Sequence, residues 1–287
     1  MWYSIDNYFG QVRMRGATRL DFVQRMSTGD VARLRAGEGA TTVFTTPIGR
    51  IVDYTRVLCF DESLLMLTGG ENQDKLIRWL RKYVFFNDDV HMTDESAQGR
   101  WMAAFDEDLP DEVRSLPLHG HVIRDGALWV RCALGANAGA WVLFTDELPA
   151  SVRERAAPMQ AFEAVRVAEG VPRFPNELGE DYIPLEAGVW DAVSFRKGCY
   201  VGQEIIARME SRGQLARRLV RLSVVSGAVA AGTEIMSNGQ PCGHVTSVSA
   251  ECALGYLRSA AYEVGRMLDS ESGVVRVEGL AGVTSVS

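Results

Sequence analysis

The spacing of hydrophobic and polar residues in the first third of the chain predicts two short helices among several strands. Residues 18–28 and 72–84 repeat apolar side chains at helical intervals, and each segment starts near a residue that favours a helix N-terminus, Thr18 or Asn72. Runs rich in β-branched and aromatic residues predict strands at residues 43–46, 51–60, 64–68 and 90–93.

The middle of the chain continues this mixture. Within residues 121–132, Asp125 and Gly126 separate two alternating runs, which is a strong signal for a two-residue β-hairpin. Residues 151–169 return to helical spacing, with a break expected near Pro158 because proline disrupts a helix interior. Strands and helices mixed in this way favour an α+β fold.

Beyond residue 213 the sequence becomes rich in short apolar runs and turn residues. The runs lie at residues 219–225, 232–236, 243–248, 252–257 and 274–277. Several short strands joined by Gly and Asn turns predict a small barrel or sandwich.

A chain of 287 residues suits two or three domains. We expect a region at residues 1–212 and a C-terminal β-barrel domain at residues 213–287. Within the first region, residues 1–41 and 146–212 are expected to form one part, with an α+β part at residues 42–145 inserted between them.

The composition is that of a globular protein, with 47% hydrophobic and 23% charged residues. A net charge of −7 argues against binding nucleic acid through a broad basic surface. Residues 196–221 nevertheless hold seven cations and two anions, a local charge of +5. This basic patch is either an exposed face of an element or a docking site for an anionic ligand, such as a glutamyl tail or the backbone of tRNA.

The cysteines and histidines do not follow the spacing of a metal site. The five cysteines are odd in number and form no Cys-x-x-Cys pair, which favours neither a disulfide framework nor zinc. His119 and His121 would share one face of a strand without further ligands at metal spacing. No signal peptide or transmembrane run is present, so we expect a cytoplasmic protein without a membrane partner.

Residues 196–208 concentrate more polar chemistry than an ordinary core segment. Lys197 lies two residues before Cys199, and its charge would favour a reactive thiolate if the loop also lies at a helix N-terminus. The alternative is that Cys199 is an unreactive thiol that packs as a small buried side chain. Gly198 and Gly202 suit positions that need positive φ or a close approach of the backbone to a ligand.

This segment resembles the signature of the YgfZ family, folate-binding relatives of the glycine-cleavage T-protein (aminomethyltransferase). The matching residues are Lys197, Gly198, Cys199, Tyr200, Gly202, Gln203, Glu204 and Arg208. The resemblance implies a multi-domain T-protein-like fold with a ferredoxin-like part and a cavity for tetrahydrofolate. It also implies a role in making or repairing iron–sulfur proteins, including those that modify tRNA.

Three further segments resemble the T-protein. Residues 49–54 are similar to its Gly-x-x-x-Asp-Asp pattern, so Asp53 and Tyr54 would lie at the folate, although Asp53 could equally be a strand residue facing solvent. Tyr54 replaces the second acid, which weakens the case for aminomethyl transfer. Arg166 matches an arginine of the T-protein that contacts folate; the alternative interpretation is that Arg166 is an exposed charge on a helix. Glu186 is a candidate acid of the folate pocket.

Two functions follow from the resemblance. The first is a tetrahydrofolate-binding factor for iron–sulfur client proteins, in which Cys199 is the redox-active or cluster-proximal thiol and catalysis is not required. The second is a folate-dependent aminomethyltransferase, for which Asp53 is the candidate catalytic carboxyl.

Overall fold

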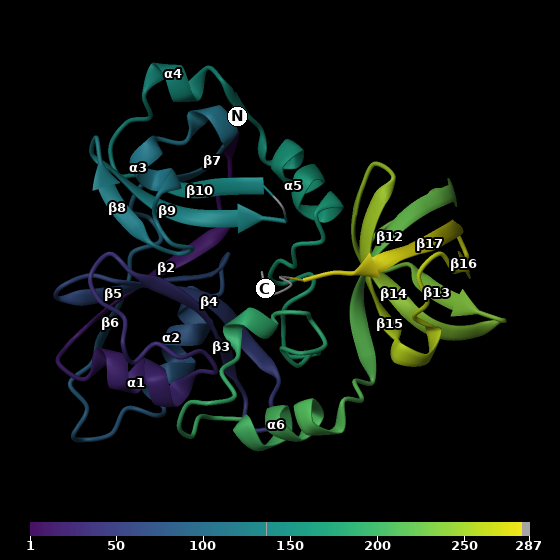
Figure 1. Cartoon of the computed structure of the whole chain (residues 1–287), viewed down its shortest axis with the longest axis horizontal. Coiled ribbons are helices and arrows are strands. Elements are labelled where there is room, and N and C mark those ends of the chain that lie inside the picture. Colours follow the sequence, from purple (N-terminus) through teal and green to yellow (C-terminus); the bar gives the residue numbers. More distant parts are fainter. Residues whose placement is uncertain (136, 283–287) are drawn as a thin grey trace.

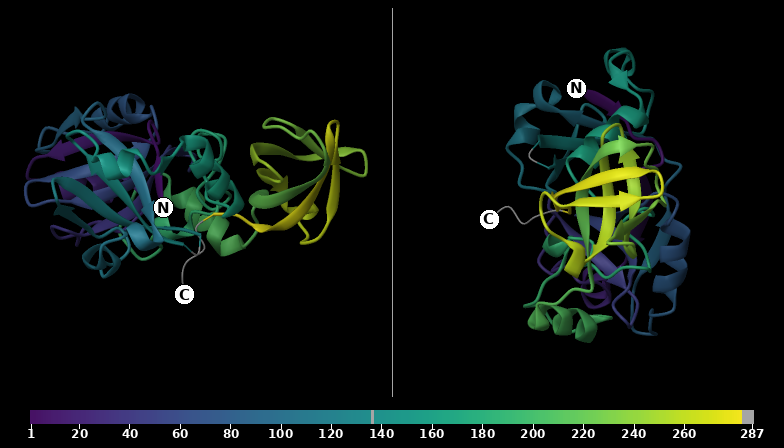
Figure 2. Two further views of the ribbon diagram at one scale, coloured as in Figure 1. Left: turned by 90° about the horizontal axis from the view of Figure 1, so that it is seen from above. Right: turned by 90° about the vertical axis from the view of Figure 1, so that its right-hand side faces the viewer.

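A computed structural model describes residues 1–135 and 137–282 and shows two sheets and a closed barrel joined by short helices (Figure 1). The two sheets lie together at one end of the molecule and the barrel lies at the other, with helical segments between them (Figure 2). The α+β class and the C-terminal barrel expected from the sequence are therefore confirmed.

The first sheet is antiparallel and has the strand order β3-β4-β5-β2-β6. Its elements are β2 (Phe9–Arg15), α1 (Arg19–Met26), β3 (Gly39–Thr45), β4 (Ile51–Cys59), β5 (Ser63–Gly69), α2 (Gln73–Arg81) and β6 (His91–Asp94). Helices α1 and α2 bury Val23 and Leu76 in one apolar cluster with strand residues such as Met66. The periodicity identified both helices because each has one face in this core.

The second sheet has the order β11-β1-β7-β10-β9-β8. Its elements are β1 (Trp2–Ser4), β7 (Arg100–Phe105), η1 (Asp106–Asp108), α3 (Asp111–Arg114), β8 (His121–Arg124), β9 (Ala127–Leu134), β10 (Asn137–Phe144), α4 (Ala150–Arg153) and β11 (Ala156–Ala157). Asp125 and Gly126 have φ of 50° and 74°, as the predicted hairpin requires. Trp141 packs with Phe9 of the first sheet, so the two sheets share a core.

Strand pairing crosses the expected boundaries within residues 1–212. Strand β2 pairs with β5, and β1 pairs with β7, although the two strands of each pair were assigned to different parts. The division into residues 1–41 with 146–212 and an inserted part at 42–145 therefore stays a proposal.

A long connection leads from the sheets to the barrel. It contains α5 (Met159–Ala168), η2 (Trp190–Ala192) and α6 (Gln203–Arg212). The helical pattern at 151–169 does break near Pro158, which stands at the N-cap of α5. None of the helices within residues 1–135 and 137–282 is long and apolar enough to cross a membrane.

The barrel closes in the order β12-β15-β14-β13-β16-β17. Its elements are β12 (Arg217–Gly227), β13 (Glu234–Ser237), β14 (Gln240–Ser249), β15 (Cys252–Arg258), η3 (Ser259–Ala261), β16 (Met267–Ser270) and β17 (Gly273–Leu280). Backbone hydrogen bonds tie both ends of the barrel chain to the connection: Leu219 N donates to Glu186 O, and Gly282 N donates to Gly170 O.

Candidate functional site

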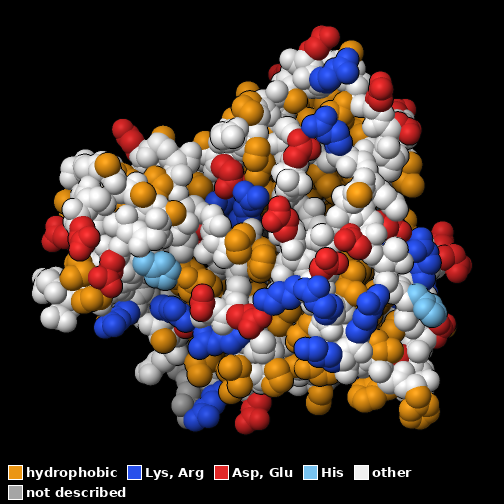
Figure 3. Space-filling view, turned by 180° about the vertical axis from the view of Figure 1, so that it is seen from behind, with side chains coloured by type: hydrophobic (Ala, Val, Ile, Leu, Met, Phe, Trp, Pro, Cys, Tyr) orange, Lys and Arg blue, Asp and Glu red, His pale blue; other side chains and the backbone are white. Residues whose placement is uncertain are grey.

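A cleft of about 640 Å³, which we call the barrel cleft, lies between the barrel and the connection. Its charged and aromatic wall residues are Arg50, Glu186, Arg217, Glu234, His244, Tyr256 and Arg258. Seen from behind, a band of Lys and Arg side chains crosses the lower middle of the molecule (Figure 3). The cleft therefore combines two carboxylates, one of them buried, with several cations in a space large enough for a drug-sized ligand.

Glu186 is the buried carboxylate of the barrel cleft. Its Oε2 accepts hydrogen bonds from the backbone N of Ile183 and from Nε of Arg217, both at 3.3 Å, and Arg50 lies 3.9 Å away. No hydrogen bond from the residues that the structure describes reaches its other oxygen, Oε1. Glu186 is thus held in place while one oxygen stays available to a ligand.

An aromatic stack joins the connection to the barrel beside this carboxylate. The rings of Tyr182 and Tyr256 lie 3.7 Å apart and nearly parallel, and the Tyr182 hydroxyl is 2.9 Å from Nε2 of His244. Burial lowers the pKa of His244, helped by the charge of Arg217, so the imidazole is neutral at neutral pH. The stack gives the cleft a flat, rigid wall.

Arg258 is the free cation of the barrel cleft. It is exposed, and no carboxylate among the described residues pairs with it. Arg50 and Arg217, by contrast, each contact Glu186 and donate to the carbonyl of Asp181. An anionic group entering the cleft would meet an unpaired guanidinium at Arg258.

Asp53 is completely buried and does not line the barrel cleft. Its carboxylate accepts hydrogen bonds from Thr55 Oγ1 at 2.6 Å, Asn72 Nδ2 at 2.6 Å and Gly69 N at 3.1 Å. Burial raises its pKa to about 6, although these hydrogen bonds oppose the shift. Asn72 stands at the N-cap of α2 as predicted, but its side chain holds Asp53 and does not cap the helix.

Tyr54 borders a much smaller space of about 20 Å³ between the first sheet and the connection, with Arg56 and Phe174 among its other walls. The guanidinium of Arg56 lies over the rings of Phe9 and Tyr54, 5.3 Å from each centroid. Such a space holds about one water molecule. Tyr54 is therefore not in contact with the barrel cleft.

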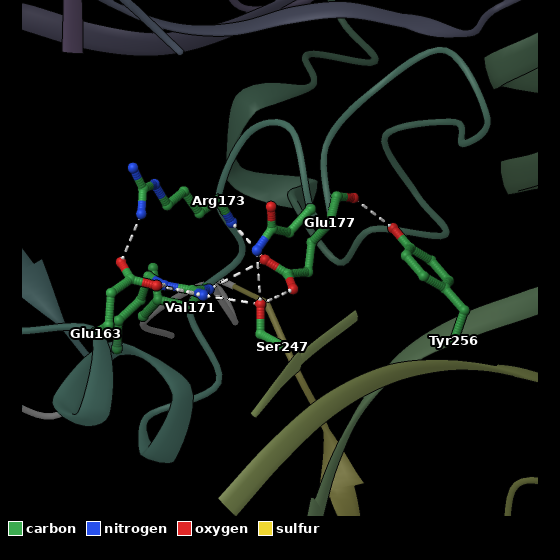
Figure 4. Close-up of polar contacts among 8 residues, drawn as sticks. Glu163, Val171, Arg173, Glu177, Ser247 and Tyr256 are labelled. Carbon is green, nitrogen blue, oxygen red and sulfur yellow. Dashed lines mark hydrogen bonds and ion pairs between the residues drawn. The ribbon is translucent and has the colours of Figure 1, made fainter. Parts of the chain in front are cut away.

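Arg166 is completely buried in an ion-pair network with Glu163 and Glu177. Its Nη1 donates to Glu177 Oε2 at 3.0 Å, and its Nη2 donates to Glu163 Oε2 at 2.9 Å and to Ser247 Oγ at 3.0 Å. Figure 4 shows Glu163, Glu177 and Ser247 meeting between α5, the following loop and the barrel, where Tyr256 also donates to Glu177 O. Arg166 is thus neither an exposed charge nor a wall of the barrel cleft.

The cysteine loop lies on the outer surface, and Cys199 is an exposed free thiol. Gly202 has φ of 84° and forms the N-cap of α6, where a Cβ would approach Thr46 O to 2.6 Å. Gly198 lacks both features, since its φ is not positive and a Cβ would meet open space. The expectation of positive φ was therefore correct for Gly202 and wrong for Gly198, and the alternative of a close approach to a ligand stays a prediction.

The other motif residues seat the loop. The ammonium of Lys197 donates to the carbonyls of Gln24, Ser27 and Gly29, and burial lowers its pKa to about 8. Tyr200 is buried against Ile206 in one apolar cluster. Gln203 and Glu204 form the first turn of α6, and Arg208 is exposed on it. Lys197 is thus a tether between the loop and the end of α1.

Three of the seven cations of residues 196–221 lie in different surroundings. Lys197 is engaged with backbone carbonyls, whereas Arg217 lines the barrel cleft and Arg218 lines a different cavity. Alternate residues of a strand point to opposite sides, so neighbours in the sequence separate in the fold.

Known proteins resemble this chain over nearly all of its length. Residues 6–103 match the family described as GCVT N-terminal domain, and residues 217–280 match CAF17, C-terminal beta-barrel domain. The chain belongs to the YgfZ family. This is a folate-binding family related to the T-protein, and the two matches lie in the first sheet and in the barrel.

Individual relatives of this YgfZ-family chain carry transferase names. A putative chloroplastic transferase of Arabidopsis thaliana is 29% identical over 94% of this chain and 68% of its own length. The aminomethyltransferase of Desulfitobacterium hafniense is 24% identical over 92% and 80%. The glycine cleavage system aminomethyltransferase T of Bartonella henselae superposes with a TM-score of 0.81, at 16% identity, over 97% of this chain and 85% of its own. The last comparison shows a shared fold.

The predicted site residues of this YgfZ-family chain therefore lie in separate places. Glu186 lines the barrel cleft, Asp53 and Tyr54 lie inside the first sheet, and Cys199 is on the surface. Sequence reasoning missed Arg50, Arg258 and His244. Arg50 lies within residues 49–54, which resemble the T-protein, so this residue had a signal in the sequence.

Proposed function

We propose that this protein binds tetrahydrofolate in the barrel cleft and assists the assembly or repair of iron–sulfur proteins, including those that modify tRNA. The observation that carries the folate part is the cleft itself, whose volume of about 640 Å³ suits a drug-sized ligand and whose walls hold a fixed carboxylate and a free guanidinium.

The residues of the barrel cleft fit the polar groups of tetrahydrofolate. The pterin ring presents N–H donors, for which Oε1 of Glu186 is an acceptor, and the glutamate tail carries carboxylates that favour a guanidinium such as Arg258. Tyr256 offers an aromatic face to a flat ring. When bound, tetrahydrofolate supplies a carrier for one-carbon units.

The position of the thiol supports a role toward other proteins. Cys199 is exposed and is not among the residues that line the barrel cleft, so a large client can reach the thiol while folate occupies the cleft. All five cysteines are free, which favours a reducing compartment such as the cytoplasm.

Aminomethyl transfer is our second candidate because relatives carry that name. It requires a carboxyl beside the reacting folate nitrogen. A pKa of about 6 suits Asp53 to proton transfer, but this carboxyl is buried among Thr55, Asn72 and Gly69 and lies outside the barrel cleft. We therefore rank the binding factor first.

Calorimetric titration with tetrahydrofolate tests the folate part. We expect Arg258→Met to weaken binding by about tenfold, because a charge-assisted hydrogen bond is lost. Arg208→Met is the matched control, since Arg208 is exposed on α6 away from the cleft, and it should bind normally. Equal affinity of both variants and the wild type would place folate elsewhere.

The iron–sulfur part needs a separate test in cells that lack the protein. The activity of an iron–sulfur-dependent tRNA-modifying enzyme is expected to return with the wild type but not with Cys199→Ala. Full rescue by Cys199→Ala would remove the thiol from the mechanism. Methylene-tetrahydrofolate formation from an aminomethylated carrier, lost in Asp53→Asn, would instead favour the transferase.

A further inference from the structure

A second cavity of about 160 Å³ lies where the chain enters and leaves the barrel, and we call it the junction cavity. Its walls come from the turn before η2, the start of β12 and the end of β17. Its apolar side chains are Leu185, Trp190, Leu215, Leu219, Leu280 and Ala281. An apolar cavity of about 150 Å³ is large enough to bind benzene, so the junction cavity has room for one aromatic ring.

One cation faces this apolar space. Arg218 lines the junction cavity and is half-buried, and no side chain among the described residues forms an ion pair or hydrogen bond with its guanidinium. Glu186 also borders the cavity, but its Oε2 already binds Arg217. A half-buried guanidinium without a counter-charge is uncommon, because buried charges are normally paired.

We propose that the junction cavity binds a small carboxylic acid with a flat apolar body of about one ring, whose carboxylate pairs with Arg218. Trp190, which is 39% exposed, provides an aromatic wall for such a body. The junction cavity and the barrel cleft share Glu186 as a wall residue, but Arg218 lines only the junction cavity and Arg258 lines only the barrel cleft.

The junction cavity adjoins the core that seats the cysteine loop. Leu185 and Leu215 line the cavity and also belong to the apolar cluster that contains Tyr200 and Ile206. A bound acid therefore contacts side chains that pack directly beneath the loop carrying Cys199.

Benzoate is the probe, with benzamide as its neutral counterpart, and binding is followed by nuclear magnetic resonance of the tryptophan indole N–H groups. The Trp190 signal is assigned by its absence in Trp190→Phe. We expect benzoate to shift this signal in a saturable way and benzamide to bind about tenfold more weakly, because a neutral amide loses the charge-assisted hydrogen bonds.

Arg218→Met should weaken benzoate binding about tenfold or more. Arg218→Lys should retain part of the affinity for benzoate, and Arg208→Met should retain all of it. Two results would overturn the proposal: equal binding of benzoate and benzamide, or benzoate binding that Arg258→Met abolishes and Arg218→Met leaves intact. The second result would place the acid in the barrel cleft.

Discussion

Replacing Arg166 by methionine tests whether this arginine supports the fold or contacts folate. The guanidinium and the carboxylate of Glu177 are both completely buried and lie 3.0 Å apart. After the substitution, Glu177 keeps its hydrogen bonds from Ser247 and from the backbone N of Arg173, but its charge loses the buried cation. Breaking a buried pair from one side costs about 3–5 kcal/mol.

Urea unfolding measures this cost. For a chain of this size the dependence of the unfolding free energy on urea is about 3 kcal/mol per molar, so the midpoint should fall by about 1 to 1.7 M. The double variant Arg166→Met/Glu177→Leu should recover most of the loss, because replacing both charges by apolar side chains is often close to neutral. Arg208→Met, an exposed change, should leave the midpoint unaltered.

Tetrahydrofolate binding by the double variant separates the two roles of Arg166. If Arg166 acts through the fold, the stable double variant binds folate with nearly the wild-type affinity. Loss of folate binding in a double variant whose urea midpoint is restored would refute this reasoning and indicate that Arg166 contacts folate. A midpoint shift below about 0.3 M in the single variant would likewise show that the ion pair contributes little.

Three further predictions concern single residues. Gly202→Ala should lower the unfolding free energy by more than about 1 kcal/mol, because of its φ of 84° and the approach to Thr46 O, whereas Gly198→Ala should be nearly neutral in the same urea assay. The pKa of Asp53 rises on folding from 3.8 to about 6, so the folded chain binds the extra proton and stability from this group falls as pH increases from about 4 to 6. The urea midpoint of the wild type relative to Asp53→Asn should fall over that range and stay constant above pH 7, and an unchanged difference would contradict the burial argument. An aqueous thiol reagent should label Cys199 in the folded protein within the first fast phase, and that phase should vanish in Cys199→Ser.

The sequence predicted the fold well where local patterns carry the information. Apolar periodicity located α1 and α2, the Asp125-Gly126 pair located a hairpin, and short runs with turn residues located the barrel. Sheet order depends on pairings between distant segments, such as β2 with β5, and local periodicity says nothing about them.

Site chemistry was harder to predict because it depends on burial and on partners far away in the chain. Arg166 lies in the last turn of α5, and only the fold brings it to Glu177 and Ser247. The run of cations at residues 196–221 suggested one patch, but Arg217 and Arg218 face different cavities. The motif at 197–208 identified the family without showing that Cys199 lies away from the barrel cleft.

The barrel cleft has walls from two bodies, with Arg50 and Glu186 on one side and His244 and Arg258 on the barrel. A ligand that touches both walls adds its binding free energy to the docking of the barrel. By thermodynamic reciprocity, a change that weakens the docking of the barrel weakens ligand binding by the same factor. The interface around Tyr182 and Tyr256 thus sets how tightly the cleft can hold any ligand, even one that those rings never touch.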